Sequence, residues 1–324
     1  MHAYDPARAT NRTVEEISRR GAIFNVNEGI VVEDGVACET RLVGWPANGT
    51  RMVSFHVLTH HPGGAYEHHG HPISEESLIC IRGQGEVDLG GGWVEVDAGN
   101  AIFVPAARQH ATRNRPGSDE DFVILSYNCP PPMELYKELG LIVHGVFDQK
   151  AIDKALLLST PGDIPAVCAA RPNDLGGPER GEVKGPEETA VTGGVFNLFR
   201  GAPFTGYGAL MKFILWPGIG AKNIGQHMAF HDPGVAFAPH VHPISEDAIY
   251  CVDGRGQGYL ESRWIDVSVG DIIYAPAGVR HGTGCRSEEL GMFTCTGCAS
   301  PPQFDLYEIA GYLNDGRFGD FEFV

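Results

Sequence analysis

The sequence has little positive charge, with 24 lysines and arginines against 41 aspartates and glutamates and a formal net charge of −17. Nucleic acids are bound mainly through clustered lysine and arginine, so this balance argues against a nucleic-acid partner. No stretch approaches the roughly 18 consecutive apolar residues of a membrane-spanning helix. The first residues also lack the apolar core of a signal peptide. We therefore expect a cytoplasmic protein that binds neither nucleic acid nor membrane.

The eight cysteines do not indicate a disulfide framework. Without an export signal they are expected to be reduced, and Cys295 and Cys298 lie in an apolar, strand-like stretch where packing is the expected role. The 43 glycines and 22 prolines favour many short strands and turns over a helical bundle. At about 150 residues per domain, 324 residues correspond to two domains.

The chain contains an internal duplication. When the sequence is shifted by 171 positions, residues 60–112 align with residues 231–283 without a gap, and 22 of these 53 positions are identical. The match extends outward to Trp45-Pro46 with Trp216-Pro217, to Leu135-Tyr136 with Leu306-Tyr307 and, at a shift of 172, to Phe24-Asn25 with Phe196-Asn197. Two copies of one domain are therefore expected to share a fold.

The duplication divides the chain into four parts. Residues 1–20 form an arm, in which the capping-box pattern Thr13-x-x-Glu16 predicts a helix over 14–20. Residues 21–140 are the first domain and 193–324 the second. The connector, 141–192, has helical spacing near 147–158, followed by a surface loop rich in glycine, proline and charge. Further helices are expected only at the end of each copy, around Leu135-Tyr136 and Leu306-Tyr307, which we call the Leu-Tyr tails.

Each copy has short apolar runs that end at glycines, such as 77–81 and 248–252. Strands punctuated in this way are typical of a sandwich or barrel. Each copy also carries an identical spacing of histidines and acids. The first copy has His69, His71, Glu75, Glu76 and His110, and the second has His240, His242, Glu246, Asp247 and His281.

Residues two apart on a strand point to the same face, so each His-x-His pair aims both imidazoles into one space. A carboxylate and a third histidine from later strands can complete the cluster. Three imidazoles and a carboxylate suit Mn, Fe, Ni or Zn, and open positions on such an ion accept substrate, water or O2. The repetition of the pattern predicts one divalent transition metal in each copy.

Both copies resemble cupins. The first cupin motif, G-x5-H-x-H-x3/4-E-x6-G, is matched by Gly63, His69, His71, Glu76 and Gly83. The second motif, G-x5-P-x-G-x2-H-x3-N, is matched by Gly99, Pro105, His110 and Asn114, with Ala107 where glycine is usual. The second copy matches at Gly234, His240, His242, Gly254, Gly270, Pro276, Gly278 and His281, and departs at Asp247 and Cys285. The resemblance implies an all-β bicupin, with two tandem β-jelly-roll barrels, a few short helices and a metal in each barrel mouth.

The carboxylate ligand in each copy is one of two adjacent acids. Glu75 and Glu246 are identical between the copies, which supports them as ligands. Glu76 and Asp247 have the cupin spacing of six intervening residues before the turn glycine. Neighbours on a strand point in opposite directions, so only one acid of each pair can face the ion. We favour Glu76 and Asp247 and leave both choices open.

The first pocket is expected to be the more polar. Glu67 precedes His69 by two residues and should face the same space, whereas its counterpart in the second copy is Ala238. Glu67 and Glu75 are therefore the candidate catalytic bases, and the first barrel is the expected site of chemistry.

The function that we expect is that of a metal-dependent dioxygenase, an oxidoreductase acting on a small enolic, phenolic or carboxylate substrate. One alternative is a Mn-dependent hydrolase or lyase similar to ureidoglycine aminohydrolases, which have a comparable W-x-x-V-x-x-G-D stretch to that at 264–271. Others are an oxalate-decarboxylase-like activity and a non-catalytic cupin that binds a small ligand. Cupin barrels commonly pair, so a homodimer or larger assembly is expected.

Overall fold

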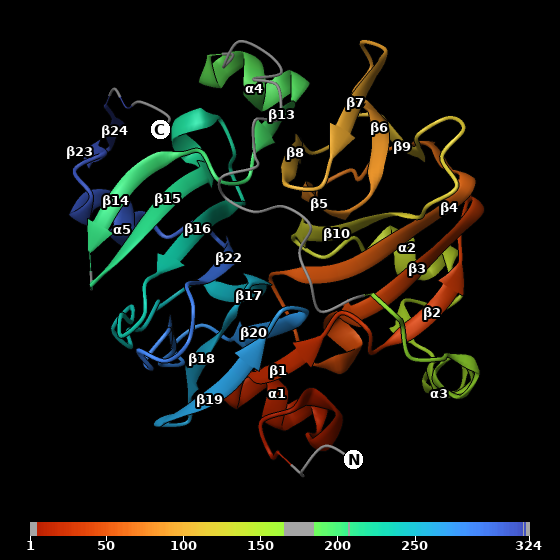
Figure 1. The fold of residues 1–324 in the computed structure, drawn as a ribbon. Helices are drawn as coiled ribbons and strands as arrows, with labels where there is room; N and C mark the ends of the chain where they lie inside the picture. Colours follow the sequence, from red (N-terminus) through yellow and green to blue (C-terminus); the bar gives the residue numbers. More distant parts are fainter. Residues whose placement is uncertain (1–4, 165–184, 207, 320, 322–324) are drawn as a thin grey trace.

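The computed structural model describes residues 5–164, 185–206, 208–319 and 321. Strands dominate this part of the chain and form two barrels side by side (Figure 1), which confirms the prediction of an all-β pair of jelly rolls. The strands of the first barrel are β2 (Ile30–Glu33), β3 (Val36–Gly44), β4 (Ser54–His69), β5 (Glu75–Arg82), β6 (Gln84–Asp88), β7 (Trp93–Asp97), β8 (Asn100–Val104), β9 (His110–Asn114) and β10 (Phe122–Cys129).

The second barrel repeats this arrangement. Its strands are β14 (Ala202–Gly206), β15 (Ala209–Leu215), β16 (Gly225–His231), β17 (Glu246–Asp253), β18 (Arg255–Leu260), β19 (Arg263–Ser268), β20 (Asp271–Ala275), β21 (Gly282–Gly284) and β22 (Phe293–Ser300). In the first barrel, β5 follows the His-x-His pair and lies between β8 and β10 in the sheet. In the second barrel, β17 lies in the same way between β20 and β22.

The two barrels exchange their first strands. Strand β1 (Ala22–Asn25) precedes the first barrel in sequence but pairs antiparallel with β20 of the second. Strand β13 (Gly194–Asn197) pairs in the same way with β8 of the first barrel, and Figure 1 shows it beside that strand. The strand that follows each expected boundary, at residue 21 and at residue 193, therefore completes the other barrel.

A continuous apolar core joins the barrels. Phe24 of the exchanged strand packs edge-on against Phe55 of the first barrel, with ring centroids 5.2 Å apart. The ring of Tyr274 from the second barrel lies 6.4 Å from that of Phe55. Burial of large aromatic side chains contributes much of the stability of such a core, so the two barrels form one packed unit.

Five short helices lie among the described residues: α1 (Val14–Arg20), α2 (Met133–Glu138), α3 (Gln149–Leu158), α4 (Pro186–Thr192) and α5 (Phe304–Ile309). The capping box predicted for α1 is present, with Thr13 and Glu16 bonded reciprocally. Helices α2 and α5 are the predicted Leu-Tyr tails. Helix α4 corrects the expectation of an irregular connector there, because Pro186 at its first turn and the acids that follow favour a helix start. The rest of the glycine-rich loop, 165–184, lies outside the described residues.

Two two-stranded hairpins complete the fold, β11 (Ile142–Val143) with β12 (Val146–Phe147) and β23 (Leu313–Asn314) with β24 (Arg317–Phe318). No helix in the described part of the chain is both long and apolar enough to span a membrane. The seven cysteines that the structure describes are all buried and none forms a disulfide.

Candidate metal centres

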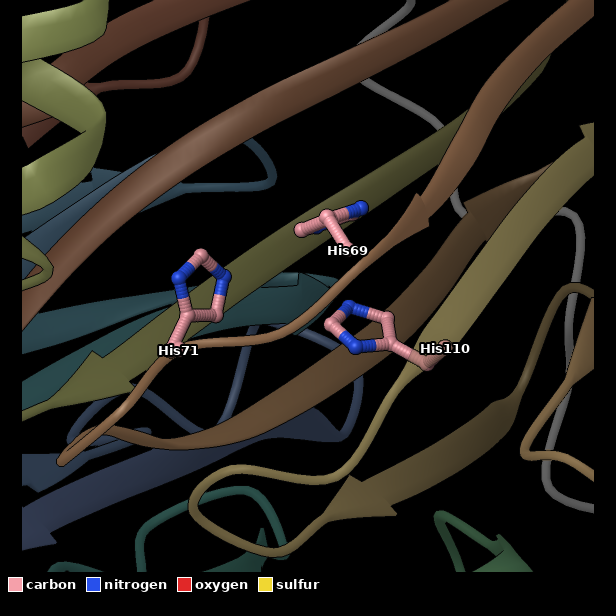
Figure 2. A group of neighbouring side chains, drawn as sticks. All are labelled: His69, His71 and His110. Atoms are coloured by element: carbon pink, nitrogen blue, oxygen red, sulfur yellow. The ribbon is translucent and has the colours of Figure 1, made fainter.

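Three histidines converge at the mouth of the first barrel. His69 ends β4 and lies opposite His110, the first residue of β9, in the pairing of these strands. His71 follows on a turn that is fixed by a 2.7 Å hydrogen bond from the Ala107 amide to the His71 carbonyl. One ring nitrogen from each histidine lies within 4.8 Å of the others. Figure 2 shows the three rings gathered in one space, as the His-x-His spacing predicted.

Glu76 adds a carboxylate to this cluster. Its Oε2 lies 2.9 Å from His110 Nε2 and 3.8 Å from His71 Nε2. Burial raises the pKa of Glu76, but the hydrogen bond and charge of His110 and the charge of His71 outweigh burial and hold this pKa well below its ordinary value. The structure therefore places Glu76, rather than Glu75, among the histidines.

Glu75 points away from the pocket and binds the second barrel. Its carboxylate accepts hydrogen bonds from the backbone amides of Lys222, at 2.9 Å, and Asn223, at 2.7 Å. Glu246 of the second barrel makes the matching contact with the first barrel. Its carboxylate accepts hydrogen bonds from the backbone amides of Arg51, at 3.1 Å, and Met52, at 2.7 Å. The proposal of Glu75 as a base in the pocket is thus wrong, because successive strand residues point to opposite faces. These reciprocal contacts also account for the identity of Glu75 and Glu246 between the copies.

Glu67 does not take the predicted place either. Its side chain is exposed and is not among the described residues that line the first cavity. Its backbone carbonyl instead accepts a 2.9 Å hydrogen bond from His69 Nδ1, which leaves Nε2 of that ring available to a metal. Burial, followed by the charge of His110, lowers the pKa of His69 to about 4, so the ring is neutral and able to act as a ligand at neutral pH.

Sequence reasoning missed a second carboxylate behind each centre. Glu134, on α2, lies with its Oε1 3.0 Å from His71 Nδ1. Asp305, on α5, holds the matching position 3.5 Å from His242 Nδ1. Histidines that bind metals commonly donate their other ring N–H to a carboxylate, which fixes the ring orientation. The available signal was that both residues are acidic and lie 171 positions apart, as the rest of the repeat does.

A cavity of about 420 Å³, which includes space open to solvent, adjoins the first centre. Its lining residues outside the centre are Asp34, Thr40, His56, Leu58, Tyr66, Leu78, Thr112, Ser126, Asn128 and Leu135. Ser126 Oγ donates to Glu76 Oε1 at 2.6 Å. Asn128 is buried, and its amide nitrogen has no hydrogen-bond partner within the described protein.

Two further histidines of the first barrel, His56 and His60, are buried inside it. His56 lies against the cavity with Nε2 3.0 Å from the Tyr136 hydroxyl, and burial lowers its pKa to about 3. His60 is bonded to Thr112 and to the Phe122 carbonyl, and burial lowers its pKa to about 4. Asn114 of the second cupin motif donates to the backbone carbonyls of His60 and Glu120, so it holds a loop.

The second centre has the same parts in a more closed arrangement. One ring nitrogen each from His240, His242 and His281 lies within 4.8 Å of the others. His240 Nε2 is only 2.9 Å from His242 Nε2. Asp247 Oδ2 lies 3.5 Å from His281 Nε2 and accepts a 3.1 Å hydrogen bond from Gln303. The aspartate therefore approaches its histidine less closely than Glu76 does, in line with its shorter side chain.

The second cavity is smaller, at about 280 Å³, and fewer of its described lining residues carry hydrogen-bonding side chains. Positions that carry hydrogen-bonding groups in the first barrel carry apolar ones here: Thr40, Tyr66, Ser126 and Asn128 correspond to Met211, Phe237, Gly297 and Ala299. The strand pairings match at these positions, since Asn128 lies opposite Glu76 and Ala299 lies opposite Asp247. The first cavity thus has more hydrogen-bonding side chains among its described lining residues, and Glu67 is not one of them.

Comparison with protein families agrees with this geometry. The family described as the cupin domain matches residues 56–127 and again residues 228–297, so each match holds the corresponding ligand cluster. The protein is a bicupin. No curated protein matches the sequence significantly.

Among solved structures, the bicupin is similar to protein Ylba from E. coli, with a TM-score of 0.58 at 16% identity over 92% of this chain and 97% of that one. It is also similar to oxalate decarboxylase from Bacillus subtilis, with a TM-score of 0.54 at 16% identity over 87% of this chain and 77% of the other. That structure concerns the Mn(II) centres of the decarboxylase. At this identity the likeness shows the fold.

Proposed function

We propose that the first barrel of this bicupin is a metal-dependent enzyme site in which His69, His71, His110 and Glu76 hold a divalent Mn, Fe, Ni or Zn ion. The observation that carries the proposal is the convergence of three ring nitrogens within 4.8 Å, together with a buried carboxylate oxygen, Glu76 Oε2, that lies 2.9 Å from Nε2 of one of these histidines, His110. Three imidazoles and a carboxylate oxygen brought this close together make a ligand set for such an ion. When bound, the ion would provide Lewis acidity and open coordination positions.

The reaction that we propose is oxidation by O2 of a small enolic, phenolic or carboxylate substrate, as in a dioxygenase. The first cavity supports it by combining the ligand cluster with an apolar wall of Leu58, Leu78 and Leu135. Such a wall suits the carbon skeleton of a substrate and excludes water. Asp34 lines the same cavity, and burial raises its pKa, so this carboxylate takes the role of proton acceptor that we had expected of Glu67 or Glu75.

A decarboxylase is the second candidate, and the likeness to oxalate decarboxylase favours it. Against a dicarboxylate substrate, the first cavity contains no lysine or arginine among its described lining residues. Only the metal would then balance the two negative charges. A hydrolase or lyase reaction at the same centre and a non-catalytic ligand-binding role are the remaining alternatives.

The proposal is tested by elemental analysis of the purified protein, followed by an oxygen-electrode screen of enolic, phenolic and carboxylate compounds. We expect metal-dependent O2 uptake that a chelator abolishes. Release of CO2 without O2 uptake would establish the decarboxylase instead, and release of ammonia would establish the hydrolase or lyase. A protein that binds metal and ligands but turns over none of these compounds would be a binding cupin.

A further inference from the structure

The rim of the first cavity offers hydrogen-bond acceptors. Asp34 lies in the turn between β2 and β3, and its Oδ2 is 3.5 Å from the Thr40 hydroxyl. The Thr40 hydroxyl in turn lies 2.9 Å from that of Tyr66. Either hydroxyl can donate in the Thr40–Tyr66 contact, and Asp34 Oδ2 accepts from Thr40. The ionised Asp34 carboxylate can only accept hydrogen bonds, so it is the acceptor that this group of residues offers to a bound molecule.

The backbone holds Asp34 at this rim. Gly35 has a φ of 72°, in the left-handed region, and a Cβ at this position would lie 2.7 Å from the Ala65 carbonyl oxygen. The turn can therefore pack closely against β4, the strand that ends in His69. As a result, the Asp34 side chain lines the same cavity as the metal ligands.

The part of the cavity beside Glu76 offers a donor. The buried Nδ2 of Asn128 has no partner in the described protein, and this residue lies directly opposite Glu76 in the pairing of β10 with β5. A buried amide without a partner is costly, so the group is suited to an oxygen of a bound molecule. Together with a cation held by the histidines, this part of the cavity favours an anionic oxygen.

We infer that the substrate of the first barrel is a small monoanion that also carries its own N–H or O–H donor, with its anionic oxygen toward Asn128 and the metal ligands and its donor toward Asp34, Thr40 and Tyr66. A dicarboxylate would place a second negative charge beside Asp34. The inference rests on the proposed metal centre and narrows its substrate class. The second barrel, with Met211, Phe237 and Ala299 at the positions of Thr40, Tyr66 and Asn128, lacks both sets of groups.

The test compares two ligands of nearly equal size and shape. Malonate has two carboxylates, whereas malonamate has one carboxylate and an amide N–H2 in place of the other. Calorimetric titration of both into Mn(II)-loaded protein gives two dissociation constants and requires no turnover. The His242→Ala background restricts the metal to the first barrel. We expect Asp34→Asn to shift the affinity ratio toward malonate by at least about tenfold, because a charge-assisted hydrogen bond is lost and a repulsion is relieved.

Asn128→Ala is the complementary variant, since it installs the residue of the second barrel. We expect it to weaken both ligands by a similar factor of about ten and to leave their ratio unchanged. Thr40→Met, which also installs the residue of the second barrel, removes the hydroxyl that links Asp34 to Tyr66 by hydrogen bonds. It should shift the affinity ratio toward malonate, as Asp34→Asn does. If Asp34→Asn folds poorly, as judged by Mn content and melting temperature, Thr40→Met provides the same comparison.

The outcomes separate this inference from the proposed function. If both ligands bind and neither Asp34→Asn nor Thr40→Met changes their ratio, the substrate class is wrong and the metal centre stands. If neither ligand binds the Mn(II)-loaded protein, the substrate class is wrong, while protein that takes up no Mn(II) in the His242→Ala background would overturn the proposed metal centre. A shift in the ratio without O2 uptake in the substrate screen would support the substrate class while overturning the dioxygenase.

Discussion

Glu75 and Glu76 are neighbours on β5, yet their carboxylates serve different barrels. Glu76 Oε2 lies 2.9 Å from His110 Nε2 in the first metal centre. Glu75 instead accepts hydrogen bonds from the backbone amides of Lys222 and Asn223 in the second barrel. In the second barrel, Asp247 lies beside His281 of the second centre, whereas Glu246 accepts a hydrogen bond from the Arg51 amide of the first barrel. Each ligand strand thus joins its own centre directly to the contact between the barrels.

Glu75→Ala should therefore destabilise the protein without emptying the first centre. Two backbone amides lose their acceptor, and we expect the free energy of unfolding to fall by about 1–3 kcal/mol. Denaturant unfolding and metal analysis of the variant measure the two effects separately. Glu76→Ala is the matched control and should lose the metal of the first barrel. A Glu75→Ala protein that keeps its stability but loses turnover would restore Glu75 as a catalytic base.

The carboxylates behind the centres give a second prediction. Glu134→Gln removes the charge that orients His71, and we expect metal affinity at the first centre to fall by about 10- to 100-fold. Asp305→Asn should have the corresponding effect at the second centre only, so the two variants serve as controls for each other. Competition titration with a chromophoric chelator measures both affinities. Equal loss at both centres in either variant would show that these residues act on the fold as a whole.

Buried histidines outside the metal centres make stability depend on pH. Burial lowers the pKa of His60 and of His231 from 6.5 to about 4. Below pH 6.5 the unfolded chain binds protons that the folded protein does not. The stabilisation by these two neutral histidines is therefore complete above pH 6.5 and is lost as the pH falls toward 4. At pH 5 each of these two histidines should lower the free energy of unfolding by roughly 1–2 kcal/mol relative to pH 7.5.

Unfolding of the metal-free protein at pH 7.5 and pH 5 tests this dependence. His60→Gln should show a smaller loss between the two pH values, whereas His61→Gln, at the exposed neighbouring position, should behave as the wild type. Equal pH dependence in all three proteins would contradict the assignment of this loss to the buried histidines.

The repeat predicted two copies of one domain, the spacing of the histidines predicted the ligand clusters, and the resemblance to cupins implied the jelly rolls. Of His69 and His71 only His69 lies on a strand, and His71 reaches the same space from a turn whose carbonyl accepts a hydrogen bond from the Ala107 amide. The cupin spacing of Glu76 from Gly83 favoured the acid that faces them. Glu67 was misplaced by the rule that residues two apart on a strand share a face, because the register of β4 with β9 shifts between Tyr66 and His69 and breaks the alternation there.

Other parts of the site depend on contacts that no local pattern records. An alternating strand pattern shows which face is buried, but it does not show that β1 pairs with β20 of the other barrel. Asp34 reaches the cavity from a hairpin turn, and Glu134 reaches His71 from a helix about 60 residues later in the sequence. Both positions follow from how the elements pack around the barrel mouth.

The central claim is that the first barrel carries the chemistry, and paired ligand variants test it most directly. Metal content per chain and O2 uptake should be measured together for His71→Ala and His242→Ala. We expect His71→Ala to remove one ion and nearly all turnover, and His242→Ala to remove the other ion with a smaller loss. If His242→Ala abolishes turnover while His71→Ala retains it, the second barrel carries the chemistry and the assignment is contradicted.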